Sequence, residues 1–337
     1  RAPLRCERRR ADRTGVSTDT VGFGVIGARS MVATRAVMPA IDTSAHVRLV
    51  AASSLGGPVP EPWTALGAGL YDDVIAHPDV DVVYVPLPNG MHAQWVERAL
   101  DAGKHVLCEK PITPSAAEAR RLADHAERAG LVLAEAWMTP FDARWRTAIG
   151  MVAAGDIGTP LDVDASFTFT IGPDGNDNYR WSHAQGGGAL LDVGIYCLGP
   201  IVELWGGVPD LVEATALWHN SGVDARTEAT LEWIDGRQAR IRCSFVDREE
   251  QRLEIIGDQA SLVLERDAHT GGAAADTIVV ARSGGSVRRL PVAPSDPYLG
   301  MVEAFAATVR GDAPWPRPMS STLELLTLLE RIAQASR

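Results

Sequence analysis

The type and position of Lys110 make it the first candidate for chemistry in this chain. It follows a short apolar run, Gly103 to Leu107, and stands in the sequence Cys108-Glu109-Lys110-Pro111. An unpaired ammonium at the end of a buried strand is costly, so a lysine in this place is expected to have a partner or a function. Pro111 lacks a backbone donor and restrains its neighbour, which stiffens the turn that orients Lys110. For an arbitrary Lys-Pro pair, however, a surface lysine at a strand end would be the ordinary explanation.

A carboxylate and a phenol four residues apart form the second candidate set. Three glycines, 186 to 188, precede an apolar segment from Ala189 to Trp205, in which Asp192 and Tyr196 share one helical face. On a buried helix beside a flexible turn, this pair indicates a lined pocket. Taken alone, the helix is explained more simply by an ion-paired Asp192 and a half-buried core Tyr196.

The stretch from Val21 to Ile41 predicts the elements that would position a cofactor. An apolar strand ends at Gly27, Ala28-Arg29-Ser30 forms a tight turn, and a helix runs from Met31 to Ile41. This is the setting of the dinucleotide fingerprint G-x-G-x-x-G, although Arg29 and Val32 replace its second and third glycines. We expect Arg29 to approach a phosphate if the helix start near Ser30 binds one.

Further strands and helices alternate up to about residue 140. Strands are expected at 46–53, 81–86, 104–108 and 131–136, and helices at 62–68, 93–102 and 115–129. This alternation predicts a parallel, doubly wound sheet of the Rossmann type. Right-handed crossovers place the strand ends at one edge, so Gly27, Ser53, Pro88 and Lys110 should meet where such sheets bind ligands.

The end of the second strand bears on the choice of cofactor. Ser53-Ser54-Leu55-Gly56-Gly57 contains no carboxylate, whereas an acidic residue at this place binds the ribose hydroxyls of NAD. Because small hydroxyl residues leave room for a 2'-phosphate, we slightly favour NADP(H) over NAD(H).

Beyond about residue 140 the expected elements no longer alternate between strand and helix, and most of them are strands. Helices are expected at 144–154, 189–205, 298–310 and 320–335, and a polar turn at 173–178. Strands are expected at 161–170, 210–218, 227–234, 238–246, 250–256, 260–265, 277–281 and 286–291, with a hairpin at Asp235-Gly236. We predict a loose Arg-rich extension at 1–20, a Rossmann domain at 21–140, and an α+β domain at 141–337 for substrate binding and oligomerisation. This last domain is built on a large, mainly antiparallel open sheet, and its final helices could pack back on the first domain.

Composition excludes several classes of function. The 337 residues carry a net charge of -11. The first 14 residues hold six Arg against Glu7 and Asp12, a charge of +4, so the remaining residues carry -15. An acidic body argues against a nucleic-acid partner. Four scattered cysteines suggest neither disulfides nor a metal site and fit a cytoplasmic location. No apolar run follows the Arg-rich start, so we expect neither a signal nor a membrane span.

Three signals together resemble the glucose-fructose oxidoreductase, inositol dehydrogenase and rhizopine-catabolism family, the Gfo/Idh/MocA oxidoreductases. They are Lys110-Pro111, Pro88-Asn89-x-x-His92, and the run from Gly186 to Tyr196, in the family's order. The resemblance covers about residues 21 to 335, and Arg29 departs from the usual glycine fingerprint. It implies hydride transfer between a nicotinamide and a carbohydrate hydroxyl or carbonyl.

The resemblance also implies roles for individual residues. Many members carry Asp-x-x-x-His, whereas Asp192 and Tyr196 are similar to the subgroup of glucose-fructose oxidoreductase, aldose dehydrogenases, dihydrodiol dehydrogenase and nucleotide-sugar 3-ketoreductases. Tyr196 would exchange the proton, and the ammonium of Lys110 would lower the pKa of that phenol and hydrogen-bond the reacting oxygen. Asp192 would hold Lys110 or a substrate hydroxyl.

The remaining site residues follow from the same resemblance and from the strand ends. Those expected at the cofactor are Gly27, Ala28, Arg29, Ser30, Ser53, Ser54, Pro88, Asn89, His92, Glu109 and Lys110; those expected at the substrate are Lys110, Arg180, Trp181, Asp192 and Tyr196. Without the resemblance, His92 would be a locally satisfied histidine at a helix start. Arg180 and Trp181 fit a salt bridge and a loop anchor equally well.

Several functions stay open at this point. Within the family they are reduction of a keto-sugar, free or nucleotide-linked, oxidation of an aldose at C1, and trans-dihydrodiol oxidation. Cations for the diphosphate of a nucleotide sugar cannot be identified. Outside these, a non-catalytic NAD(P)-binding regulator or an NAD-dependent glycosidase would use the same fold. The resemblance implies a homodimer or homotetramer, because the open sheet pairs face to face in this family.

Overall fold

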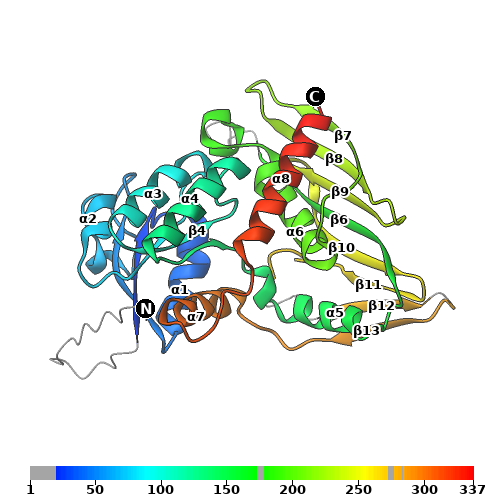
Figure 1. Ribbon diagram of the computed structural model, residues 1–337, viewed down its shortest axis with the longest axis horizontal. Helices are drawn as coiled ribbons and strands as arrows, with labels where there is room; N and C mark the ends of the chain where they lie inside the picture. The colour runs from blue at the N-terminus through cyan, green and yellow to red at the C-terminus, as the bar shows by residue number, and fades with distance from the viewer. Residues whose placement is uncertain (1–19, 173–177, 272–276, 283) are drawn as a thin grey trace, which may run out of the picture.

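The computed structural model describes residues 20–172, 178–271, 277–282 and 284–337, which form two sheets joined by helices (Figure 1). The predicted extension at 1–20 and the polar turn at 173–178 therefore lie almost wholly outside the described residues. The first sheet, sheet A, is built between residues 21 and 136, and the second, sheet B, between 160 and 291. The boundary expected near residue 140 falls between the last strand of sheet A and the helix that precedes sheet B.

Sheet A is the predicted parallel sheet, with strand order β2-β1-β3-β4-β5. Its strands are β1 (Val21–Ile26), β2 (Val47–Ser53), β3 (Val82–Val85), β4 (His105–Glu109) and β5 (Leu133–Ala136). Every residue of β1 and β3 is buried, as expected of parallel strands covered on both faces. Helices α3 (His92–Asp101) and α4 (Ala116–Ala129) cover one face, and α1 (Met38–Thr43) and α7 (Pro297–Arg310) cover the other.

Two predictions in this half need correction. The first helix starts at Met31 as expected, but residues Ala33–Val37 form a π-helical turn before α1. The helix expected at 62–68 is a single 3-10 turn, Thr64–Leu66, and the true helix follows as α2, Tyr71–Ala76. Because α2 is so short and follows a Gly- and Pro-rich stretch, its apolar period is too brief to identify from sequence.

Sheet B confirms the predicted mainly antiparallel sheet, in the order β13-β12-β11-β10-β6-β9-β8-β7. Its strands are β6 (Pro160–Thr170), β7 (Leu211–Trp218), β8 (Asp224–Glu232), β9 (Gln238–Ser244), β10 (Val246–Gly257), β11 (Ala260–Leu264), β12 (Thr277–Arg282) and β13 (Val287–Pro291). Among its described strand pairs, β6 and β9 alone run parallel, next to the antiparallel central pair β10 and β6. In β8 buried residues alternate with more exposed ones, so one face packs on helices and the other is polar.

Helices join the two sheets. In Figure 1, α8 (Met319–Ala335) runs between the two halves, and α6 (Ile195–Trp205) lies beside it under sheet B, with α5 (Ala143–Ala153) further along. Glu330 of α8 accepts a hydrogen bond from the backbone N–H of Ala116 at 2.8 Å, which caps α4 in the first half. Arg331 donates to the carbonyl of Pro209 at 2.7 Å, just before β7. The last helix therefore ties sheet A to sheet B.

The expectation that no segment approaches a membrane span is wrong as far as length and composition go. The helical segment His183–Trp205 has 23 residues, and its most apolar window has a mean hydropathy of 1.4. However, 78% of that window is buried inside the protein. The apolar composition is thus explained by packing between sheet B and α8.

A glycine in α6 makes a close approach that predicts a stability difference. A Cβ on Gly199 would lie 2.1 Å from Cζ2 of the Trp137 ring, so we expect Gly199→Ala to lower the free energy of unfolding by about 1–3 kcal/mol. Gly150→Ala in α5 is the control, because no heavy atom lies within 4 Å of the added methyl, and it should stabilise by up to about 1 kcal/mol. Urea unfolding measures both. Equal stability of the Gly199→Ala protein and the unsubstituted protein would contradict the packing.

Candidate active site

A cavity of about 780 Å³ lies where the carboxyl ends of the sheet A strands meet sheet B and the start of the α6 region. Most of the predicted site residues line it: Gly27, Arg29, Ser30, Ser54, Pro88, Asn89, Glu109, Lys110, Arg180, Asp192 and Tyr196. They come from four strand ends of sheet A and from two segments of the second half, which are far apart in sequence. The parallel sheet brings the first group together, and the packing of the two halves adds the second.

The turn after β1 shows why glycine is needed at this edge. Gly27 has φ +92, and a Cβ there would lie 2.7 Å from Cδ2 of Leu87 in the turn after β3. Its backbone N–H donates to the carbonyl of Ser53 at the end of β2. The turn therefore lies close against both neighbouring strands, and Arg29 and Ser30 are presented to the cavity.

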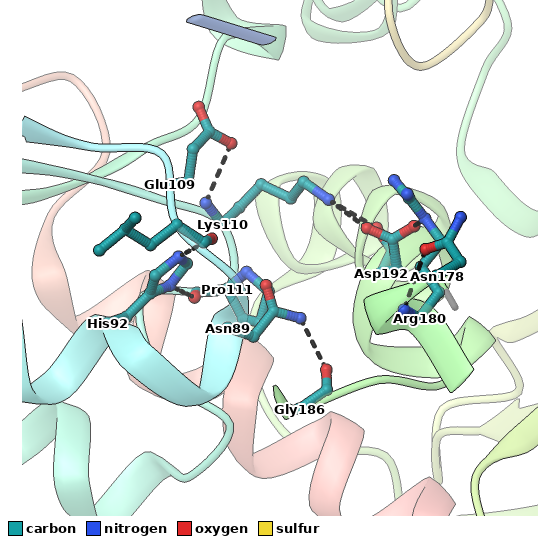
Figure 2. A network of polar contacts seen from close by, with 10 residues as sticks. Asn89, His92, Glu109, Lys110, Pro111, Asn178, Arg180, Gly186 and Asp192 are labelled. Carbon is teal, nitrogen blue, oxygen red and sulfur yellow. Dashed lines mark hydrogen bonds and ion pairs between the residues drawn. The ribbon is translucent and has the colours of Figure 1, made fainter. Parts of the chain in front are cut away.

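Asp192 joins the two halves at the centre of the site (Figure 2). The ammonium of Lys110 donates to Oδ1 of Asp192 at 3.1 Å and to its backbone carbonyl at 2.7 Å, and Nε of Arg180 donates to Oδ2 at 2.5 Å. The side chain of Asp192 is 4% exposed. Burial acts to raise its pKa, but Lys110 and Arg180 outweigh burial and hold the pKa of this carboxyl below its usual range. Asp192 therefore stays ionised between two cations.

Tyr196 lies beside this cluster, at the junction of a π-helical turn, Leu190–Gly194, and α6. The Lys110 ammonium stands 4.8 Å from the centroid of its ring, a cation–π contact with the ring face. Burial raises the pKa of Tyr196 well above its usual value, and the carboxylates of Glu109 and Asp192 add to the effect. The prediction that Lys110 lowers this pKa is therefore wrong. Asp192 already balances the ammonium, and burial disfavours a phenolate.

A stack of side chains fixes the plane of the Tyr196 ring. The ring lies 5.2 Å from that of Trp137 at an interplanar angle of 26°, and the guanidinium of Arg317 is 4.9 Å from the centroid of Trp137. Arg317 also faces the carboxylate of Glu135 at 3.7 Å, and both are buried. Among the described residues the indole N–H of Trp137 has no hydrogen-bond partner. Packing, rather than a hydrogen bond, therefore holds the indole against the tyrosine.

Glu109, which precedes Lys110, is held by a second phenol. The hydroxyl of Tyr84 on β3 donates to Glu109 at 2.7 Å, and the backbone N–H of Lys110 donates to the same carboxylate at 3.3 Å. Burial raises the pKa of Glu109, while the charge of Lys110 acts against that rise. The carboxyl thus has a fixed direction at the end of β4, where it lines the cavity.

The Pro88–His92 turn has one residue in the cavity wall and one behind it. Asn89 lines the cavity and donates to the carbonyl of Gly186 at 2.8 Å, which connects it to the glycine turn of the second half. His92 is fully buried, and its ring nitrogens lie 2.8 Å and 2.7 Å from the carbonyl oxygens of Pro111 and Leu87 (Figure 2). The imidazole therefore joins two strand-end turns from behind and does not line the cavity.

Three other predicted residues also lie outside the cavity wall. Ala28 is fully buried, and its backbone N–H donates to the carbonyl of Ser53. The hydroxyl of Ser53 donates to the carbonyl of Gly69 at 3.0 Å. Trp181 stacks on His219 with ring centroids 4.4 Å apart, which matches the loop anchor considered for it. These side chains shape the turns that carry cavity residues.

Several lining residues were not predicted from sequence: Arg35, Tyr71, Phe167, Phe169, Tyr179, Glu249, Gln251, Thr270 and Tyr298. A signal existed for Phe167 and Phe169, since alternate positions of a strand face one side. Tyr179 adjoins the predicted Arg180. No local pattern identifies Glu249, Gln251 or Thr270: Gln251 reaches the site through the pairing of β10 with β6, Glu249 lies in the irregular part of that pairing, and Thr270 is held by its hydrogen bond to Gln251.

This fold and site define a class of protein. A Rossmann sheet whose strand ends share a cavity with a lysine, an aspartate and a tyrosine from a second domain is that of a dinucleotide-dependent oxidoreductase. Residues 21–136 match the family model described as oxidoreductase family, NAD-binding Rossmann fold, and residues 145–263 match the GFO/IDH/MocA C-terminal domain. The chain belongs to the Gfo/Idh/MocA oxidoreductases, as the sequence predicted.

Similar proteins have been characterised. The chain is 35% identical to the D-xylose 1-dehydrogenase (NADP(+)) 2 of Haloferax volcanii, over 87% of this chain and 90% of that protein. It is 32% identical to the dTDP-3,4-didehydro-2,6-dideoxy-alpha-D-glucose 3-reductase of Saccharopolyspora spinosa, over 94% and 98%. A crystal structure of a 3-ketoreductase from Actinomadura kijaniata with NADP and TDP-benzene superposes with a TM-score of 0.85 at 27% identity, covering 94% of this chain and 98% of that one.

The buried imidazole of His92 predicts a pH dependence of stability. Burial lowers the pKa of His92 from 6.5 to about 4. The unfolded chain therefore takes up a proton that the folded protein resists, and the stability contributed by the neutral ring is complete above pH 6.5 and is lost as the pH falls toward 4. Between pH 7 and 4.5 this contribution falls by about 2 kcal/mol.

Urea unfolding at both pH values tests the effect. The loss of stability on acidification should be smaller by that amount in His92→Gln. The matched control, His46→Gln, removes an exposed histidine and should leave the loss unchanged. An identical loss in His92→Gln and the unsubstituted protein would mean that His92 is not kept neutral by the fold.

Proposed function

We propose that this protein is an NADP(H)-dependent oxidoreductase that transfers a hydride between the nicotinamide and the carbonyl or hydroxyl carbon of a carbohydrate. The observation that carries the proposal is the contact of Lys110 with both Asp192 and Tyr196 at the edge where Rossmann sheets bind dinucleotides. Similar proteins named D-xylose 1-dehydrogenase (NADP(+)) and keto-sugar 3-reductase support the cofactor and the substrate class. Retention of both Lys110 and Tyr196 argues against a regulator without turnover.

The residues at the end of β2 support NADP(H). No carboxylate stands in Ser53 to Gly57, and the guanidinium of Arg29 lies against this loop, since a Cβ on Gly57 would be 2.7 Å from Nη1 of Arg29. A cation and small residues suit a 2'-phosphate better than a 2'-hydroxyl. Arg35 also lines the cavity and adds positive charge on the same side.

Tyr196 and Lys110 have different roles at the reacting oxygen. NADPH, when bound, supplies the hydride that reaches the substrate carbon. Tyr196 is a neutral phenol because its pKa is raised, so it can donate its proton to the carbonyl oxygen as negative charge develops there. Lys110 stabilises the same oxygen by a charge-assisted hydrogen bond, and Asp192 and Arg180 keep the ammonium in place.

The protonation state of Tyr196 also bears on direction. A neutral phenol is ready to give a proton but cannot accept one at the same oxygen as a base. The arrangement thus favours reduction of a carbonyl near neutral pH, and oxidation of a hydroxyl becomes easier at alkaline pH.

Dihydrodiol oxidation is the second candidate. Phe167 and Phe169 line the cavity, and the Phe167 ring lies 5.6 Å from that of Tyr196, so an apolar ring could be accommodated. A homodimer or homotetramer paired through the polar outer face of sheet B, and a cytoplasmic location, remain predictions. Light scattering of the purified protein measures the first.

Two substitutions test the proposed chemistry. Tyr196→Phe keeps the ring stack but removes the proton donor, so kcat for sugar reduction should fall by about 10²- to 10⁴-fold. Lys110→Met should lower kcat by about 10²-fold or more, because the charge at the reacting oxygen is lost. Tyr71→Phe is the control: Tyr71 lies on α2 and lines the same cavity, and removing its hydroxyl should change kcat by no more than a few-fold. Full turnover by either active-site variant would refute these roles.

A third substitution tests the cofactor. Arg29→Ala should raise KM for NADPH by about 10- to 100-fold, because charge-assisted hydrogen bonds are worth about 1.5–3 kcal/mol. KM for NADH should change little, since NADH lacks the 2'-phosphate. A parallel loss for both cofactors would mean that Arg29 contacts the pyrophosphate or supports the turn instead.

A further inference from the structure

The part of the cavity formed by sheet B carries polar groups close to Tyr196. In the pairing of β10 with β6, Gln251 lies opposite Phe167, whose ring is 5.6 Å from that of Tyr196. The hydroxyl of Thr270 donates to Oε1 of Gln251 at 3.0 Å, which leaves the amide NH₂ of that glutamine as a donor. Glu249, Gln251 and Thr270 all line the cavity. The sheet B side of the cavity thus combines the aromatic rings of Phe167 and Phe169 with polar groups that can bind hydroxyls.

The charges of the cavity are distributed unevenly. Among the described residues, its basic lining consists of Arg29, Arg35, Lys110 and Arg180. Arg29 and Arg35 belong to the turn and helix that follow β1, on the cofactor side. Lys110 and Arg180 are both bound to Asp192, which balances part of their charge. Apart from the Asp192 cluster and the residues that follow β1, the described cavity wall therefore carries no basic side chain that could bind a second polyanion.

The sheet B side carries net negative charge instead. Glu249 is exposed in the cavity, and its carboxylate forms no ion pair with another described residue. A diphosphate is normally bound by arginine, lysine or backbone N–H groups, and a carboxylate in its path is repulsive.

We infer that the substrate is an uncharged sugar that is not linked to a nucleotide, and that Glu249 excludes phosphate-bearing sugars while Glu249 and Gln251 bind hydroxyl groups. A carboxylate accepts hydrogen bonds from two or more hydroxyl groups, and an amide NH₂ donates hydrogen bonds to hydroxyl oxygens. Both therefore suit a polyol. The inference rests on the proposed function and selects among its substrates. It separates this chain from the nucleotide-sugar reductases that it resembles.

The experiment compares matched sugars with the NADP(H)-saturated protein, so that nucleotides do not compete for the cofactor site. Free aldoses and keto-sugars are assayed beside dTDP-linked sugars at the nicotinamide absorbance. We expect kcat/KM for the best free sugar to exceed that for any linked sugar by at least tenfold. In calorimetry, dTDP at millimolar concentration should show no binding to the NADP⁺-saturated protein.

A charge reversal connects the exclusion to Glu249. Glu249→Lys should gain dTDP binding, with a Kd at least about tenfold below the concentration at which the unsubstituted protein shows none, because repulsion becomes attraction. Its KM for free sugar should rise while KM for NADPH stays unchanged. Glu127→Lys makes the same change of net charge on the exposed face of α4 and should gain no dTDP binding.

The outcomes distinguish this inference from the proposed function. A higher kcat/KM for a dTDP-linked sugar, or dTDP binding to the unsubstituted holoenzyme, overturns the inference and leaves the oxidoreductase proposal standing. Equal dTDP binding by Glu249→Lys and Glu127→Lys overturns the role of Glu249. If no sugar, free or linked, is turned over while NADP⁺ binds, the proposed function fails and the inference fails with it.

Discussion

The ion cluster on Asp192 is the interaction on which the site depends. One buried carboxylate binds an ammonium from the end of β4 and a guanidinium from the loop before the π-helical turn, so it joins sheet A to the second domain. The Asp192 side chain is 4% exposed, that of Lys110 12% and that of Arg180 21%, so the cost of withdrawing these charges from water is offset by their close mutual contacts. The cluster therefore sets the distance between the two halves at the cavity. It also determines where the one lysine of the site can reach.

The stack around Tyr196 gives this residue, the proposed proton donor, a defined position beside the ion cluster. Lys110 contacts the face of the phenol ring, while Trp137 and Arg317 hold the plane of the ring from the side of the core. Because the hydroxyl lies among buried groups and two carboxylates, the neutral form is stabilised. The same packing explains the glycine at position 199, where any side chain would meet the indole of Trp137. The proposed acid–base chemistry and the core packing thus depend on the same contacts.

Charge is divided along the cavity in a way that separates its two expected ligands. Arg29 and Arg35 place positive charge beside the β1 turn, and Glu249 places negative charge on sheet B. The protein as a whole is acidic, with a net charge of -11, so a local positive region is needed for an anionic cofactor. The neutral, hydroxyl-rich substrate inferred above would bind at the opposite end, where the polar groups of β10 line the cavity.

By itself the sequence pattern determined the parallel sheet and the mainly antiparallel second sheet, while the resemblance of three motifs to the family placed Lys110, Asp192 and Tyr196 in one site. Apolar runs alternating with amphipathic segments specify such sheets, and parallel strands place their ends at one edge. Only the tertiary structure decided that Ala28, Ser53, His92 and Trp181 support turns without lining the cavity, because a local pattern does not show which side of a turn a side chain occupies. It also decided the raised pKa of Tyr196, which arises from burial and from carboxylates distant in sequence. Gln251 enters the site through strand pairing with Phe167, 84 positions earlier in the chain, and Glu249 lies in the irregular part of the same pairing; contacts of that range leave no periodicity in the chain.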